Sequence, residues 1–147
     1  MSTSKPPSIS ATASINRDGA LALIKAARSA AQDIGIEVAI AVTDAGGHLT
    51  AFERSEHSAF LTADVAIDKA WTAASFGLGT HAWNTIVSDA KVAPLAHRPR
   101  LVAVGGGVPI RLNGQLVGGI GISGGTADQD QQAAEVALRA LGFDVPA

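Results

Sequence analysis

Residues 108–125 read VPIRLNGQLVGGIGISGG and carry the clearest hairpin signal of the chain. Asn113-Gly114 lies between two short runs of strand-like sequence, which is the strongest short-range signal for a β-hairpin. On the second strand, one face carries Leu116, Gly118, Ile120 and Ile122, and the other carries Val117, Gly119, Gly121 and Ser123. The latter face is nearly bare backbone. Because glycine weakens a strand, we expect a close neighbour there, most simply a packed helix and less simply a ligand.

The remaining chain shows both helical and strand periodicity on either side of this hairpin. We expect, in chain order, a helix between Asn16 and Gly35, strands over 38–43 and 48–54, helices starting near Ser58 and Thr80, strands over 101–104, 108–112 and 115–123, and a helix between Thr126 and Gly142. This order predicts an α+β fold with five antiparallel strands, and it argues against alternating βαβ units.

Length and composition bound the class of protein. The 147 residues fit one domain, so we predict a single domain over residues 16–147 after a flexible, Pro/Ser-rich tail over residues 1–15. Charged residues form only 16% of the chain, which leaves few polar side chains to cover the surface. We therefore expect a homo-oligomer that buries apolar surface between subunits.

Charge and cysteine content exclude several kinds of function. The formal net charge of −2 gives no attraction for nucleic acid or an anionic membrane, so neither is expected as a partner. The chain has no cysteine, which excludes disulfides and thiolate catalysis. No segment has the pattern of a secretory signal or a membrane span, so we expect a cytoplasmic protein.

Five blocks of sequence resemble, in this order, the GlcG/HbpS-like family of haem-binding or haem-degrading proteins. They are Asp44–Leu49 (DAGGHL), Phe52–Arg54 (FER), Ala66–Ala73 (AIDKAWTA), Gly105–Pro109 (GGGVP) and Gly118–Gly125 (GGIGISGG). The resemblance covers Asn16 to Leu141. It implies a profilin-like three-layer α/β/α sandwich around a five-stranded antiparallel sheet, assembled into homo-oligomers. It also implies binding of a small ligand, haem in some members, although function varies across the family.

One loop departs from the family pattern. Where relatives often read Arg-Met-Asp-Gly-Ala, this chain has Arg54-Ser-Glu-His-Ser-Ala59. If the loop lines the ligand site, Glu56 and His57 alter what binds there, and the inference of haem is weaker at this position.

Histidines are the candidate metal donors. Haem iron needs one axial donor from the protein, and either His48 at a strand edge or His57 in the loop could supply a neutral imidazole. His48 is the first choice. The alternative is that both are solvated turn residues.

Arg54, Lys69, Gly106 and Gly107 are the remaining candidate ligand-binding residues. The two cationic side chains could hold a carboxylate or a haem propionate, and the glycines could donate backbone N–H groups to the same anion. Lys69 projects toward the stripe of alanines on its helix, where desolvation would lower its pKa. The alternatives are a lysine that snorkels to solvent and glycines required by turns.

The leading hypothesis is a protein that binds a small ligand, either haem or another carboxylate-bearing molecule, in a cleft near the glycine-rich turns. The alternative from another class is a catabolic enzyme, an isomerase, deaminase or hydrolase acting on a small unsaturated carboxylate. In that case Asp44 or Lys69 would be the general base and Arg54 the carboxylate clamp. A third possibility is an accessory subunit without a ligand of its own.

Overall fold

The computed structural model describes residues 4–146. Its elements are, in chain order, α1 (Arg17–Asp33), β1 (Ala39–Asp44), β2 (Leu49–Arg54), α2 (Leu61–Phe76), α3 (Thr80–Ile86), the 3₁₀ helix η1 (Ala93–His97), β3 (Gly107–Leu112), β4 (Gln115–Ser123) and α4 (Ala127–Ala140). Two of the predicted helix starts are capped as expected, whereas α2 begins at Leu61 after Phe60 and receives no side-chain cap from Ser58. The side chain of Asn16 caps α1, and Thr126 and Gln129 form a capping box at the start of α4.

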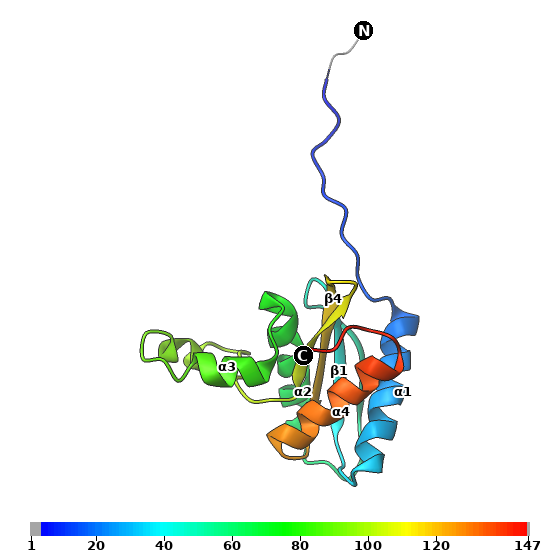
Figure 1. Cartoon of the computed structure of the whole chain (residues 1–147), viewed down its shortest axis with the longest axis vertical. Helices are drawn as coiled ribbons and strands as arrows, with labels where there is room; N and C mark the ends of the chain where they lie inside the picture. Colours follow the sequence, from blue (N-terminus) through cyan, green and yellow to red (C-terminus); the bar gives the residue numbers. More distant parts are fainter. Residues whose placement is uncertain (1–3, 147) are drawn as a thin grey trace.

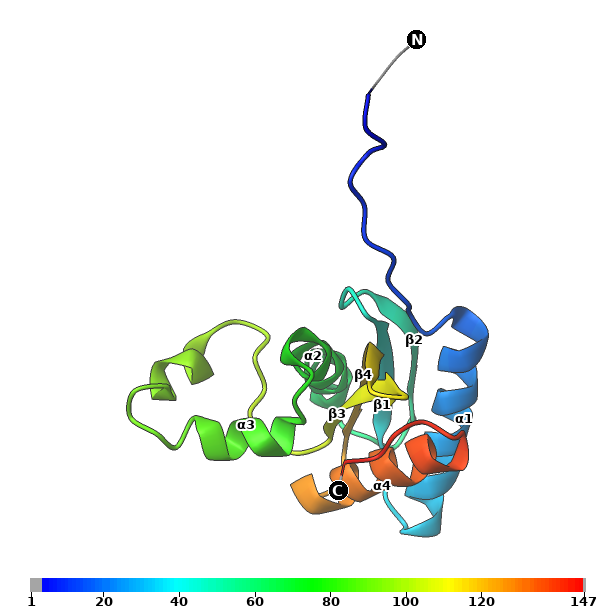
Figure 2. The same ribbon diagram turned by 45° about the horizontal axis from the view of Figure 1, so that its top comes forward.

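The strands form one antiparallel sheet in the order β2-β1-β4-β3, so the predicted mixed α+β class with an antiparallel sheet is confirmed. Helices α1 and α4 cover one face, and α2 covers the other (Figure 1 and Figure 2). The larger core lies on the α1 and α4 side and includes Leu23, Ile40, Ile120 and Leu138. The α2 side is closed mainly by the alanines Ala39, Ala41, Ala66 and Ala70.

Helix α2 covers the nearly bare face of β4. Of the two expected neighbours, a packed helix and a ligand, the helix is the one found. A Cβ atom added at Gly119 would lie 2.2 Å from the carbonyl oxygen of Ala70. At Gly121 it would lie 2.0 Å from the carbonyl oxygen of Ala66. Helix and strand backbones are therefore in direct contact, and the glycines allow that contact because they lack side chains.

The prediction of five strands is wrong, because the sheet in residues 4–146 has four. The missing strand is the segment 101–104, which lies beside α2 and α3. Val102 N donates to Thr72 Oγ1 at 3.1 Å, and Asn84 Nδ2 donates to the carbonyl of Ala103 at 2.9 Å. Side chains thus take the place of a strand partner. A four-residue apolar run looks the same in the sequence whether it pairs in a sheet or is held by side chains of neighbouring helices.

Two segments leave the compact body. Residues 4–12 extend away from it, and α3 with η1 forms a projection beside α2 (Figure 1 and Figure 2). The chain joins the body at Ser14 and Ile15: the Ser14 Oγ accepts from Ala45 N, and Ile15 N donates to the carbonyl of Val117. Within residues 4–146, no helix has the length and apolarity that a membrane crossing requires.

Candidate functional site

The turn between β1 and β2 holds an aspartate–histidine pair. The side chain of Asp44 accepts hydrogen bonds from the backbone N–H groups of Gly46 and His48 at 2.9 and 3.0 Å. The same carboxylate lies 3.1 Å from Nδ1 of His48. Burial raises the pKa of Asp44, but the hydrogen bonds from His48 and Gly46 outweigh it, and the pKa lies below the ordinary value. Asp44 is therefore a carboxylate at neutral pH.

An ionised carboxylate only accepts hydrogen bonds, so Nδ1 of His48 carries the proton in this pair. In the neutral imidazole, Nε2 then keeps its lone pair. The side chain of His48 is 81% exposed, which leaves Nε2 accessible. A carboxylate on one imidazole nitrogen is the arrangement that orients histidine as a metal ligand through the other nitrogen.

A small pocket of about 290 Å³ lies beside this pair, and we call it the turn pocket. It is lined by Ala45, Gly46, Gly47, Trp71, Ala74 and Ser75. The His48 ring packs against Gly46, where an added Cβ would lie 2.8 Å from the ring carbon Cε1. Trp71 is held by Arg100, whose guanidinium lies 4.4 Å from the ring centroid and donates to Asp68 at 2.9 Å. The pocket is therefore built from small and aromatic residues.

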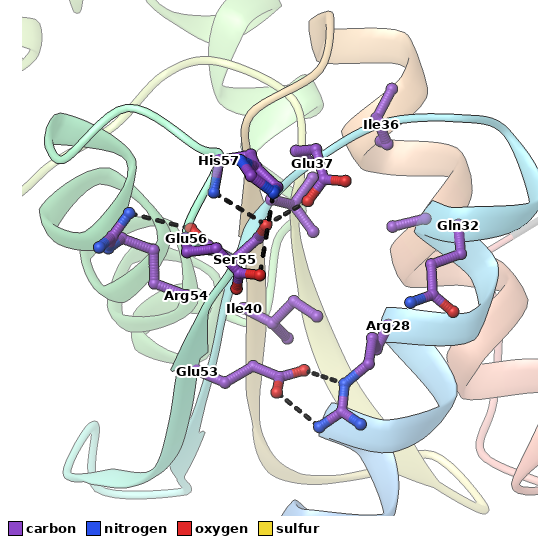
Figure 3. A pocket seen from close by; sticks show the side chains of 12 residues that line it. Arg28, Gln32, Ile36, Glu37, Ile40, Glu53, Arg54, Ser55, Glu56 and His57 are labelled. Carbon is purple, nitrogen blue, oxygen red and sulfur yellow. Dashed lines mark hydrogen bonds and ion pairs between the residues drawn. The ribbon is translucent and has the colours of Figure 1, made fainter.

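A second cavity lies at the opposite end of the β1–β2 hairpin, and we call it the sheet-end cleft (Figure 3). It has a volume of about 360 Å³, within the range of small-molecule sites. Its charged lining consists of Arg28, Arg54, Glu37, Glu53 and Glu56, together with His57. The loop that departs from the family pattern, residues 54–59, thus does line a cavity. The carboxylates in this lining outnumber the guanidinium groups.

Most charges of the sheet-end cleft already have partners. Arg28 and Glu53 form a two-point ion pair with bonds of 2.7 and 2.6 Å, and the Ser55 hydroxyl donates to Glu37 (Figure 3). Arg54 donates to the backbone carbonyls of Ser55 and Ser58. With three glutamates against two arginines, the lining disfavours an anionic guest.

Lys69 lies in the interior and pairs with Asp130 of α4. Its Nζ donates to Asp130 Oδ2 at 3.2 Å and to the carbonyl of Ile122 at 2.8 Å. Both side chains are 3% exposed. Burial lowers the pKa of Lys69 and raises the pKa of Asp130, and their mutual attraction opposes both shifts. The ammonium group therefore reaches no solvent, unlike a snorkelling lysine.

Comparison with known proteins identifies the family. Residues 15–139 match the family described as "Haem degrading protein HbpS-like". The chain is a member of the HbpS-like family. It is 33% identical over 129 residues to an uncharacterized 15.0 kDa protein from the dhaT-dhaS intergenic region of Citrobacter freundii, a match that covers 86% of this chain and 91% of that protein.

Two further relatives of this HbpS-like chain bear on function. Protein GlcG of Escherichia coli K12 is 36% identical over 109 residues, covering 74% of this chain and 81% of GlcG. The solved structure of a PduOC:haem complex superposes with a TM-score of 0.83 at 28% identity, covering 91% of this chain and 99% of that one.

The HbpS-like fold separates the residues that the sequence suggested as one ligand site. Lys69, Gly106 and Gly107 do lie together, since a Cβ at Gly106 would lie 2.7 Å from Lys69 Nζ. Their groups are already engaged: Gly106 N donates to Gln131 Oε1, and Gly107 N donates to Thr80 Oγ1.

His48 and Arg54 are separated from each other and from this cluster. His48 directly precedes β2 and Arg54 ends it, so about 20 Å of extended chain separates the two residues. His48 adjoins the turn pocket, and Arg54 lines the sheet-end cleft. Asp44 is close to His48 alone among these residues.

Sequence reasoning missed two residues of this HbpS-like chain: Asp130, which pairs with Lys69, and Trp71, which lines the turn pocket. Asp130 was not among the candidate site residues, although a lysine directed at an apolar stripe requires a buried acceptor if it does not reach solvent. Trp71 is half-buried and lies off the alanine stripe of α2, and that position is the sequence signal that could have placed it outside the core.

Proposed function

We propose that the chain binds haem and that Nε2 of His48 is the protein's ligand to the haem iron. The observation that carries the proposal is the Asp44–His48 pair, which fixes the imidazole through Nδ1 and leaves Nε2 accessible. The family description and the haem-bound PduOC neighbour support it. When bound, haem would supply a redox-active iron that also binds small diatomic ligands.

The turn pocket fits this guest better than the sheet-end cleft. Its small side chains and Trp71 suit the apolar face of a porphyrin, whereas the glutamates of the cleft would repel the propionates. At about 290 Å³ the turn pocket holds only part of the ring. We propose that a second copy of the chain covers the rest, in the homo-oligomer expected from composition.

We propose binding rather than catalysis because the two candidate general bases are already engaged. The carboxylate of Asp44 accepts three hydrogen bonds from its own turn. Lys69 is buried against Asp130. For the fold, we propose that the sheet with helices on both faces is the profilin-like sandwich that the resemblance implies.

The test is a haem titration followed by the Soret absorbance, with the wild-type chain and four single variants. We expect His48→Ala to weaken haem binding at least about tenfold and to change the Soret position, because the axial ligand is lost. His57→Ala, His81→Ala and His97→Ala are matched controls and should behave as wild type. Since the chain has no cysteine, thiolate ligation cannot interfere. Wild-type affinity in His48→Ala, or no shift of the free-haem Soret band on addition of the wild type, would refute the proposal.

A further inference from the structure

The two edges of the sheet differ in how well they are closed. On the outer side of β3, Gly107 exchanges hydrogen bonds with Thr80, Pro109 has no N–H, and the carbonyl of Arg111 accepts from Asp144 N. These are three common means of protecting an edge strand. The β3 edge is therefore closed by the chain itself.

The outer edge of β2 is open. The strand ends the sheet, contains no proline, and has no neighbouring segment paired with it among the residues that the structure describes. Two large apolar side chains on it are exposed, Leu49 at 49% and Phe52 at 39%. An open edge with exposed apolar side chains is a template for a further strand.

The extended segment before α1 has the pattern of such a strand. Residues 8–13 read SISATA, so Ile9, Ala11 and Ala13 alternate with hydroxyl residues. Ile9 is 89% exposed, and for residues 5–12, all described, no pairing with the sheet is seen. The six residues match the six of β2, and Pro6-Pro7 would end the pairing.

The segment cannot reach the β2 edge of its own chain without reversing. It is anchored at Ser14 and Ile15 and runs away from the body in both views (Figure 1 and Figure 2). Between residues 8 and 14 there is no glycine or proline at which a tight turn would form.

We propose that residues 8–13 of one copy add as a strand to the β2 edge of a second copy. This exchange would give the sheet the fifth strand that one chain does not supply. Main-chain hydrogen bonds would hold the added strand, and Ile9 would cover part of the exposed apolar surface of β2. The occupant of the edge is thus a second copy of this chain, independent of any ligand at the turn pocket.

Disulfide trapping between separately purified variants tests the exchange, because the natural chain has no cysteine. Ile9→Cys is mixed with Leu49→Cys or with Phe52→Cys under mild oxidation. We expect a crosslinked dimer of twice the 14.8 kDa chain mass with at least one of them. Leu112→Cys, an exposed site at the end of β3, is the control and should give no more than background.

A proline substitution then tests the strand itself. Ser10→Pro in the Ile9→Cys chain should lower the yield of the trapped dimer at least about tenfold, because proline interrupts strand pairing. Lys5→Pro, which precedes the existing prolines, should leave the yield unchanged. Because residues 5–12 are exposed, neither change threatens folding. Equal trapping with Leu112→Cys, no trapping at β2, or full trapping with Ser10→Pro would overturn the proposal.

Discussion

Removal of one partner of the Lys69–Asp130 pair is expected to destabilise the chain strongly. In Asp130→Ala, the ammonium group of Lys69 would keep the carbonyl of Ile122 as acceptor but lose its counter-charge inside the protein. Leaving one member of a buried ion pair uncompensated costs about 3–5 kcal/mol. With a urea m value of about 2 kcal/mol/M for a domain of this size, the midpoint of urea unfolding should fall by about 1.5–2.5 M.

Replacing both partners should cost much less than replacing one. In the double variant Lys69→Met, Asp130→Leu, no charge remains to be desolvated, and buried ion pairs exchanged for apolar residues are often neutral in stability. The matched control is Asp68→Ala, which breaks an ion pair with Arg100 whose side chains are 27% and 45% exposed. That variant should lose under about 1 kcal/mol.

Circular dichroism in a urea series measures all of these variants. The reasoning is refuted if Asp130→Ala loses no more than Asp68→Ala, or if the double variant is as unstable as the sum of its single changes. The first result would mean that the Lys69–Asp130 pair is hydrated in solution. The second would mean that its two members contribute to stability independently.

Three further predictions concern β4 and the turn. Gly121→Ala should lower the free energy of unfolding by about 3 kcal/mol or more in thermal melts, because the new Cβ would overlap the carbonyl of Ala66; a near-wild-type melt contradicts the packing. The stability advantage of wild type over Asp44→Asn should be full above about pH 4 and decline as the pH falls through the folded-state pKa of Asp44, which lies below 3.8. An advantage that grows as the pH is lowered below about 4 contradicts it. Gly46→Ala should weaken haem binding severalfold in the Soret titration, because its Cβ would push the His48 ring away; unchanged affinity argues against the proposed ligand.

Local signals in the sequence predicted the elements well. The cap at Asn16, the capping box at Thr126 and the Asn113-Gly114 turn each depend on residues within four positions of one another. The segment 101–104 was mispredicted because its environment is set by Thr72 and Asn84, which are distant in sequence. Local apolar pattern carries no information about such partners.

The candidate site was less predictable than the elements. Grouping His48 with Arg54 in one site overlooked a limit that the predicted strand already set, since five extended residues lie between them. The direction of Lys69 on α2 left burial and snorkelling both open, and the partner that accompanies its burial, Asp130, lies 61 residues away. Long-range pairing of this kind follows from the sheet order, which the chain's periodicity does not specify.

The glycines of β4 leave no room for a ligand on their face of the sheet. A strand face without side chains could accept either a helix or a guest, and here α2 brings the backbones of Ala66 and Ala70 against Gly121 and Gly119. No guest fits between backbones in van der Waals contact. The same packing directs Trp71 of α2 to the turn pocket, where Gly47 would place a Cβ 3.1 Å from its ring. The packing that excludes a ligand from the sheet face therefore builds the aromatic wall beside His48.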